Sequence, residues 1–314
     1  MGMLDGKIAI ITGAGRGLGR EEALLMAKEG CNLVVNDLGA GFDGKGAEAK
    51  VADIVAEECR KFGVKAVGNY DSVTDFNKTK AMIDQAVSEF GKLDIVVNNA
   101  GILRDRMLFN MAEEEFDDII AVHLKGTFNM TRHAAAYFRT MGKADPDLKN
   151  FGRIINTASD AGLLGNVGQT NYGAAKAGIA AFTIISSMEL KKYANVNCIV
   201  PVARTRLTTD ATPTMVEVMN KLDESGFDVF DPANVAPMVA FLASDKAKKI
   251  SGEVFRVVAD RVYIYQGWHT YNQIDNGGKP FTPEILAERV KSELMKGAPR
   301  KETLMDAIGS LIKM

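Results

Sequence analysis

The 314-residue chain lacks the features that mark secreted, membrane-bound and nucleic-acid-binding proteins. Its three cysteines, Cys31, Cys59 and Cys198, are widely spaced and form no C-x-x-C pair, so we expect reduced core residues rather than metal ligands. No apolar run approaches the roughly 20 residues that cross a bilayer. The net charge of −2 gives no basic excess, so we expect neither a nucleic-acid partner nor a membrane surface.

We recognise no targeting signal at either end of the sequence. The stretch from Met1 to Lys7 leads straight into an apolar strand, without the basic and apolar segments of a signal peptide. The last three residues, Ile312-Lys-Met314, do not form a peroxisomal signal. We therefore expect a cytoplasmic protein.

The composition is that of an ordinary globular protein, with 46% hydrophobic and 25% charged residues. Short apolar runs alternate with helical patterns through the first two hundred residues, which predicts a parallel sheet covered on both faces. The expected strands span 7–11, 32–37, 65–71, 93–101, 153–158, 195–201 and 253–259, and the expected helices 20–28, 47–62, 74–90, 113–139 and 172–192. The prediction is a Rossmann-type doubly wound α/β fold of about seven strands.

A glycine-rich turn, Thr12-Gly-Ala-Gly-Arg-Gly-Leu-Gly19, follows the first strand and opens the first helix. The order of a strand, a glycine turn, a helix, a second strand and an acidic residue is typical of a dinucleotide-binding unit. Glycines let the backbone approach a pyrophosphate at a helix N-terminus, where amides and the helix dipole favour the anion. Asp37 lies about 20 residues after the turn, where a carboxylate takes the ribose hydroxyls.

The residues around Asp37 bear on the choice of cofactor. Its carboxylate would repel a 2′-phosphate, whereas Arg16 inside the turn could favour one, and Leu38 offers no second cation. We expect NAD, with NADP the less favoured alternative. Asp71, at the end of the third strand, could touch the adenine. The glycine-rich insertion at 39–46 is expected to be a surface loop, or else a contact near the adenosine.

Tyr172 and Lys176 are four residues apart, so a helix places both on one face. Ser159 follows the strand at 153–158, at the sheet edge where ligands bind. A phenol titrates near pH ~10, and a neighbouring ammonium should lower that pKa. The serine hydroxyl can hold a substrate oxygen. The set predicts proton transfer to or from an alcohol or ketone.

Three further polar features lie near this edge. The strand at 93–101 ends in Asn98-Asn-Ala-Gly101, which suits cofactor contact. Arg104 and Arg106 could meet an anionic substrate, although we favour ion pairs with nearby carboxylates. His123, in the helix at 113–139, could sit behind the catalytic cluster, or could be hydrogen-bonded within a packed layer.

Over about residues 5–260 the chain resembles the short-chain dehydrogenase/reductase family. The motifs that carry the resemblance are Thr12-Gly-x-x-x-Gly-x-Gly19, Asn98-Asn-Ala-Gly101, Ser159, Tyr172-x-x-x-Lys176 and Pro201 to Thr208. Within the family it is similar to the (3R)-hydroxyacyl-CoA dehydrogenase unit of peroxisomal multifunctional enzyme type 2 and its bacterial single-domain relatives. This closer similarity lies in Val35–Gly39 with the insertion, Asn98–Arg106, Val122–Gly126 and Gly165–Tyr172.

The resemblance implies a catalytic set. Tyr172 would be the general acid/base, Lys176 would lower its pKa and bind the nicotinamide ribose, and Ser159 would orient the substrate oxygen. His123 replaces the asparagine that supports the lysine in the broader family. The expected cofactor-binding residues are Gly13, Arg16, Gly17, Leu18, Gly19, Asp37, Asp71, Asn99, Ala100, Gly101, Tyr172, Lys176, Pro201 and Thr208, with no metal site. Homodimers or homotetramers are expected.

The chain departs from the family pattern at two further places. After Pro201 the expected glycine is Val202, although Thr208 is retained. The last strand, which usually ends in Gly-Gly, here continues as Asp260–Trp268.

The tail from 269 to 314 exceeds the family core, so we expect a domain at 1–268 and a helical extension at 269–314. Thr282-Pro-Glu284 has the chemistry of a helix start. Two apolar stripes follow, formed by Ile285, Leu286, Val290 and Leu294, and by Leu304, Ile308, Leu311 and Ile312. The extension is expected to pack on its own subunit, or to reach across a dimer toward a neighbour's substrate cleft.

The sequence thus predicts an NAD-dependent oxidoreductase acting on a secondary alcohol or ketone. The expected substrate is a small molecule, a 3-hydroxyacyl-CoA or similar bulky acyl thioester. A steroid or alicyclic alcohol dehydrogenase is the first alternative. A nucleotide-sensing protein without catalysis is the second, and the intact set of Ser159, Tyr172 and Lys176 weighs against it.

Overall fold

The computed structural model of the protein describes residues 2–41, 50–145, 147–205, 219, 226–304, 306 and 307. It divides into two units, Met1–Tyr265 and Gln266–Lys313, which are described separately. Thr208, most of the glycine-rich insertion, and Ile308, Leu311 and Ile312 of the second tail stripe lie outside the described residues.

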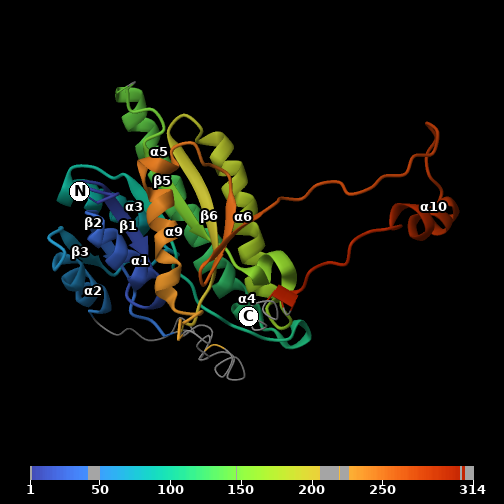
Figure 1. The fold of residues 1–314 in the computed structure, drawn as a ribbon, viewed down its shortest axis with the longest axis horizontal. Coiled ribbons are helices and arrows are strands. Elements are labelled where there is room, and N and C mark those ends of the chain that lie inside the picture. Colours follow the sequence, from blue (N-terminus) through green and yellow to red (C-terminus); the bar gives the residue numbers. More distant parts are fainter. Residues whose placement is uncertain are drawn as a thin grey trace. The chain divides into compact units, whose positions relative to one another are not determined.

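The first unit is built on one sheet, which within the described chain has the strand order β3-β2-β1-β4-β5-β6-β7-β8 (Figure 1). The strands are β1 (Ile8–Thr12), β2 (Asn32–Asn36), β3 (Ala66–Asn69), β4 (Ile95–Asn98), β5 (Gly152–Thr157), β6 (Ala194–Val202), β7 (Val254–Val258) and β8 (Arg261–Tyr265). Strands β1 to β7 pair in parallel, and β8 runs antiparallel to β7. The doubly wound α/β prediction is therefore confirmed, with one antiparallel strand beyond the seven expected.

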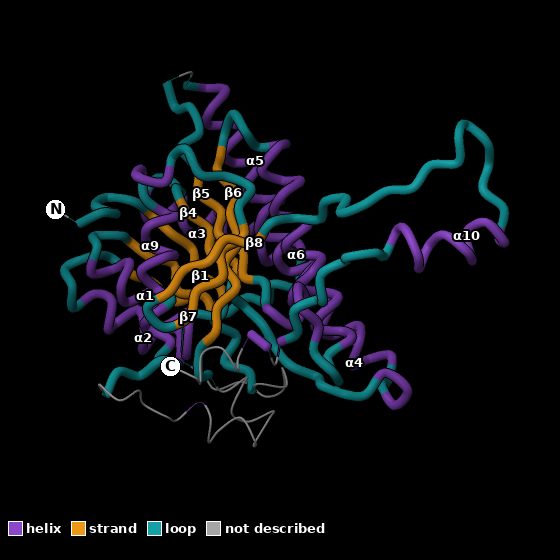
Figure 2. Tube along the Cα trace, turned by 45° about the vertical axis from the view of Figure 1, so that its right-hand side comes forward, coloured by secondary structure: helices purple, strands orange, loops and turns teal. Residues whose placement is uncertain are grey.

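Helices cover both faces of this sheet, as Figure 2 shows with the strands between two groups of helices. One face carries α1 (Gly17–Lys28), α2 (Val51–Arg60) and α9 (Ala236–Ala243). The other carries α3 (Phe76–Phe90), α5 (Gly126–Ala144) and α6 (Thr170–Glu189). The helix predicted at 113–139 consists of α4 (Glu113–Ile119), a π-helical segment (Ile120–Lys125) and α5.

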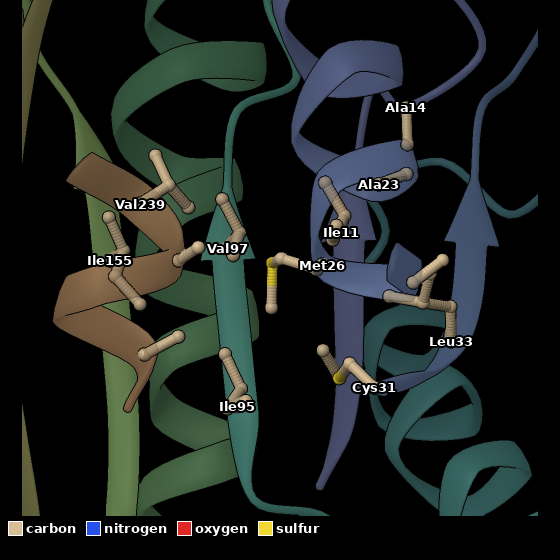
Figure 3. Packing of buried hydrophobic residues seen from close by; sticks show 14 of the residues in the cluster. Ile11, Ala14, Ala23, Met26, Cys31, Leu33, Ile95, Val97, Ile155 and Val239 are labelled. Carbon is tan, nitrogen blue, oxygen red and sulfur yellow. The ribbon is translucent and has the colours of Figure 1, made fainter. Parts of the chain in front are cut away.

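Successive residues of each central strand enter the cores on opposite faces, because side chains alternate along a strand. In β1, Ile11 packs with Met26 of α1, whereas Ile10 packs with Met82 of α3. Figure 3 shows the first of these clusters, where Met26 meets Ile11 and residues of β4. Burial on both faces explains the continuous apolar runs from which the strands were predicted. The cysteines Cys31, Cys59 and Cys198 are buried free thiols, as expected.

The sheet order reverses at β1, which lies between β2 and β4. The connections from β1 and from β4 leave toward opposite sides, so a crevice opens beyond the carboxyl ends of these strands. The glycine turn and the segment Asn99–Gly101 both lie at this reversal. The fold therefore places the predicted cofactor site where doubly wound proteins bind nucleotides.

The second unit contains α10 (Pro283–Arg289), continued by a π-helical segment (Val290–Leu294). The Thr282 hydroxyl accepts a hydrogen bond from the backbone N–H of Ile285 at 3.4 Å and Pro283 occupies the first turn, which confirms the predicted helix start. How this unit packs stays a prediction. Across the described residues no helix has both the length and the apolar character that a membrane crossing requires.

Candidate active site

The glycine turn is compact because its glycines admit approaches that a side chain would block. Gly13 and Gly17 have φ angles of +66° and +53°, in the left-handed region that favours glycine. A Cβ on Gly13 would lie 2.8 Å from Cα of Ala100, and one on Gly19 would lie 2.4 Å from the Gly13 carbonyl oxygen. The turn therefore packs directly against the loop after β4, and α1 begins at its edge.

Asp37 is held against this turn by backbone amides. Its Oδ2 accepts from the N–H of Gly15 at 2.8 Å and its Oδ1 from the N–H of Gly39 at 2.7 Å. A carboxylate oxygen can accept a second hydrogen bond, so the fixed group retains capacity for hydroxyl donors. This is the geometry needed to recognise a ribose diol.

A cavity of about 640 Å³ opens beside these residues. Nine of the predicted cofactor residues line it: Gly13, Arg16, Gly17, Leu18, Asp37, Asp71, Asn99, Ala100 and Gly101. Gly19 does not line it, because it lies beneath the turn against the Gly13 carbonyl. Pro201, which lies in β6 opposite Val257 of β7, also does not line it, and neither do Tyr172 and Lys176. Thr208 is outside the described residues.

The two asparagines after β4 support the backbone. Asn99 donates from Nδ2 to the carbonyl oxygens of Thr12 and Gly13 at 3.1 and 3.0 Å, and so ties the glycine turn to the loop after β4. Asn98 is buried and donates to Asn156 Oδ1 at 2.8 Å. Asn98 therefore links β4 to β5 inside the fold.

The catalytic candidates come together from three elements: Ser159 after β5, Tyr172 and Lys176 on α6, and His123 on the π-helical segment. The Ser159 hydroxyl lies close enough to the Tyr172 phenol to lower its pKa. Lys176 Nζ lies 5.5 Å from the centre of the Tyr172 ring and donates to the carbonyl oxygen of Thr157 at 2.6 Å. The helical spacing and the strand-end position therefore assemble one cluster.

The pKa of Tyr172 is raised, whereas the sequence led us to expect a lowered one. Burial raises this pKa to about 12, with the Ser159 hydrogen bond opposing the change and the Asp105 carboxylate reinforcing it. Burial also lowers the pKa of Lys176 to about 8. Desolvation penalises both charged forms, and sequence alone does not report desolvation. At neutral pH the tyrosine is a phenol, the form that donates a proton to a ketone.

Both positions considered for His123 apply: it lies behind the catalytic cluster, and it is hydrogen-bonded within a packed layer. It is buried, its Nε2 lies 2.8 Å from the carbonyl oxygen of Ile102, and its ring meets the Tyr172 ring edge-on. Burial and the nearby Lys176 lower the pKa of His123 to about 3, so the ring is neutral. The same Nε2 also lies 3.2 Å from the Ile102 N–H, so each neutral tautomer makes one of these two backbone contacts, and Nδ1 has no hydrogen-bond partner among the described residues.

Arg104 and Arg106 form the ion pairs that we favoured. Arg104 Nη2 lies 3.0 Å from Asp118 Oδ2, and Arg106 Nη2 lies 2.9 Å from Glu115 Oε1. Arg104 also lines the cavity.

Sequence reasoning missed several residues that hold the cluster together. Asn171 donates from Nδ2 to the carbonyl oxygens of Arg104 and Glu115 at 3.0 and 2.9 Å, which ties the start of α6 to the loop after β4 and to α4. Gln169 donates to Asp105 Oδ2 at 2.8 Å. Both residues lie in the stretch before Tyr172 that carried the closer resemblance, and this was the available signal.

Comparison with known proteins agrees with this geometry. The family model for short chain dehydrogenase matches residues 7–215. The chain is 42% identical over 292 residues to the hydroxyacyl-CoA dehydrogenase ChsB1 of Mycobacterium tuberculosis, covering 92% of this chain and 88% of the relative. It matches the crystal structure of a short chain dehydrogenase from Mycobacterium avium with a TM-score of 0.82 and 42% identity, covering 96% and 99% of the two chains. The chain belongs to the short-chain dehydrogenase family, whose enzymes act on CH–OH groups.

One similar protein is much longer than this chain. The chain is 42% identical over 286 residues to the peroxisomal hydratase-dehydrogenase-epimerase of Neurospora crassa, covering 91% of this chain but 30% of that protein. Family membership implies a nicotinamide dinucleotide, NAD or NADP, and the described residues fit one, because the glycine turn opens a helix and Asp37 lines the cavity beside it.

Proposed function

We propose that this protein is an NAD-dependent dehydrogenase that interconverts a secondary alcohol and a ketone on a 3-hydroxyacyl-CoA or a similarly bulky acyl thioester. The observation that carries the proposal is the convergence of Ser159, whose hydroxyl lowers the pKa of the Tyr172 phenol, with Lys176, whose Nζ lies 5.5 Å from the centre of the Tyr172 ring. The fold brings this cluster and the glycine-lined cavity to the same edge of the sheet.

The protein's part in the reaction follows from these contacts. When bound, the nicotinamide ring accepts or supplies the hydride at the carbon that bears the substrate oxygen. The Tyr172 hydroxyl gives its proton to the ketone oxygen in reduction and takes the alcohol proton in oxidation. The Ser159 hydroxyl orients the substrate oxygen. Lys176, fixed by the Thr157 carbonyl, would bind the nicotinamide ribose and favour the phenolate when it is itself charged.

The preference for NAD rests on Asp37. Backbone amides fix its carboxylate in the cavity wall, where a 2′-phosphate would meet a negative charge. Leu38, the next residue, offers that phosphate no cation. Arg16, which also lines the cavity, is the residue that would favour NADP.

The thioester substrate rests on the named activities of the relatives, a hydroxyacyl-CoA dehydrogenase and a hydratase-dehydrogenase-epimerase. Arg104 and Asp118 both line the cavity, but their ion pair offsets the positive charge that Arg104 would offer an anionic substrate. We also propose a homo-oligomer. The cytoplasmic location remains a prediction, and some similar proteins are named peroxisomal.

The experiment is a substrate panel followed by the near-ultraviolet absorbance of NADH. The purified protein is given NAD or NADP with 3-hydroxyacyl-CoAs of several lengths, steroid alcohols and cyclic alcohols. Turnover of a 3-hydroxyacyl-CoA with a kcat/KM above that of the other alcohols, and higher with NAD, supports the proposal. Turnover of steroids or cyclic alcohols alone rejects the thioester, and cofactor binding without any turnover rejects the enzyme.

A further inference from the structure

We propose that the buried group formed by Asp160, Arg256 and Tyr265 positions the Ser159 hydroxyl, which makes Tyr265 on β8 a positioning residue for the reaction. The proposal rests on the proposed function, because it assigns the contacts that hold Ser159 in place. It also gives a role to β8, the strand that the sequence pattern did not predict.

The Asp160 carboxylate is held from two strands. Its Oδ2 accepts from Arg256 Nε of β7 at 2.8 Å, and its Oδ1 accepts from the Tyr265 hydroxyl of β8 at 2.7 Å. Asp160 is 4% exposed and Arg256 is 6% exposed. Hydrogen bonds to a buried ionised carboxylate are among the strongest in a protein, so these contacts fix the aspartate firmly.

The register of the β7–β8 hairpin brings the two donors to one place. Arg256 pairs with Tyr263, and Val254 pairs with Tyr265. Residues two apart on a strand share a face, so Arg256, Tyr263 and Tyr265 point to the same side of the sheet. The guanidinium of Arg256 lies 5.6 Å from the centre of the Tyr263 ring, which agrees with this arrangement. A hairpin of another register would carry the Tyr265 hydroxyl away from Asp160.

Asp160 is the residue directly after Ser159, and the backbone that follows it fixes the serine. The Ser159 Oγ accepts from the N–H of Ala161 at 3.2 Å, and its hydroxyl lowers the pKa of Tyr172, as a donor directed toward the phenol would. The Ser159 carbonyl accepts from the N–H of Gly162 at 2.9 Å. Both donors belong to the short turn that starts at Asp160, so the direction of the serine hydroxyl depends on the placement of that turn.

The same turn packs against the helix that carries the acid/base. A Cβ on Gly162 would lie 2.5 Å from the backbone nitrogen of Ala177, so the turn touches the α6 backbone itself. The hydrogen bonds of Asp160 thus attach one side of the turn to β7 and β8, and the other side of the turn packs against α6. We therefore expect the loss of one of these two hydrogen bonds to leave the fold intact but to let the serine hydroxyl turn away from Tyr172.

The test is Tyr265→Phe, which removes the hydrogen bond to Asp160 and leaves the Arg256–Asp160 ion pair in place. Tyr263→Phe is the matched control, because it removes a phenolic hydroxyl from the same strand and keeps the ring that faces Arg256. Asp160→Asn is less suitable, because it leaves the buried Arg256 without its charge partner and endangers folding. Urea unfolding of both tyrosine variants establishes that the compared proteins are folded.

We expect Tyr265→Phe to lower kcat for the alcohol on the order of tenfold, while the Kd for NAD stays within about twofold, because misplaced groups lose rate more than they lose cofactor binding. The Ser159 hydroxyl lowers the pKa of Tyr172. Its displacement should therefore move the rise of the oxidation rate to higher pH. Tyr263→Phe should leave kcat, the Kd for NAD and the pH dependence of the oxidation rate unchanged.

A double variant separates a positioning role from a general structural one. If Tyr265 acts through Ser159, then Tyr265→Phe costs rate in the wild-type background and almost none in a Ser159→Ala background. Equal costs in both backgrounds, or a Tyr265→Phe variant that behaves like Tyr263→Phe, overturn the inference. If Ser159→Ala by itself retains full activity, it is the proposed catalytic role of Ser159 that fails.

Discussion

The imidazole ring of His123 stands edge-on to the phenol ring of Tyr172, with ring centres 5.1 Å apart and planes at 87°. Its Nε2 is fixed by the backbone of Ile102, the residue after Gly101. A Cβ on Gly101 would lie 2.5 Å from His123 Cε1, closer than any real contact. Glycine at this position is therefore what allows the histidine to pack behind the acid/base.

Replacing Gly101 with alanine tests this packing. We expect Gly101→Ala to lower the free energy of unfolding by about 1–3 kcal/mol, the cost of forcing an extra methyl into a packed site. The histidine should be displaced toward Tyr172, and kcat should fall. Urea unfolding and steady-state rates measure both effects.

A second substitution checks the cause. His123→Ala removes the ring that the new methyl meets, so Gly101→Ala should cost little stability in that background. If the alanine costs the same with and without His123, the strain lies in the backbone or the cofactor loop instead.

Tyr172→Phe tests the assignment of the acid/base. The variant keeps the ring that packs against His123 and Lys176 but has no hydroxyl to transfer a proton. We expect kcat to fall by about a thousandfold or more, within the range of general acid–base catalysis combined with lost orientation. The Kd for NADH, followed by its fluorescence, should stay within a few fold. A variant with wild-type rates would show that another group transfers the proton.

Asp37→Ala tests the choice of cofactor. Loss of the carboxylate removes the acceptor for the ribose hydroxyls and the charge that opposes a 2′-phosphate, so kcat/KM should fall with NAD and rise with NADP. The ratio of the two values should change on the order of a hundredfold, as expected for a lost pair of charge-assisted hydrogen bonds. Arg16→Ala is the opposing control and should weaken NADP alone. An unchanged ratio in Asp37→Ala would place the discrimination elsewhere.

The parts of the structure that the sequence predicted are those set by local pattern. The run Ile8–Thr12, buried on both faces, reads directly as a central strand. The glycine turn leads to Asp37 at a fixed chain distance, and Tyr172 and Lys176 share a face by helical period alone. Each of these relations spans few residues, so propensity and spacing determine it.

The parts that could not be predicted depend on distant chain segments or on backbone atoms. Asp160 meets Arg256 and Tyr265 across 96 and 105 residues, and no local pattern joins them. The partner of Lys176 is a backbone carbonyl, that of Thr157, which any residue type supplies. The pKa of Tyr172 was expected to fall because a cation is near, whereas desolvation of the phenol in the fold raises it. Burial depends on the assembled fold, so sequence spacing could not give its sign.

Glu22 on α1 provides a prediction about stability. The side chain is fully buried, and neither carboxylate oxygen has a hydrogen-bond partner among the described residues. Burial raises the pKa of this carboxyl from 4.5 to about 8. The folded protein therefore keeps a proton that the unfolded chain releases as the pH rises above 4.5.

The sign of the pH dependence follows from proton counting. Between pH 4.5 and about 8 the unfolded state binds fewer protons at this site, so stability falls as pH rises. The loss approaches roughly 1.4 kcal/mol per pH unit inside this window and ceases above it. Glu22→Gln, which is neutral at every pH, should be free of this loss. We expect the stability of the variant relative to wild type to increase on the order of 3 kcal/mol between about pH 5 and about pH 8.

The measurement is urea unfolding of wild type and Glu22→Gln at several pH values across this range. Glu21→Gln is the matched control, because the neighbouring Glu21 is partly exposed on the same helix and pairs with Arg20. Its stability relative to wild type should change by only a few tenths of a kcal/mol over the range, as is usual for an exposed ion pair. If Glu22→Gln shows the same flat difference as Glu21→Gln, the Glu22 carboxyl ionises in the folded protein as readily as in the unfolded chain, and the buried side chain must have a partner that stabilises its charge.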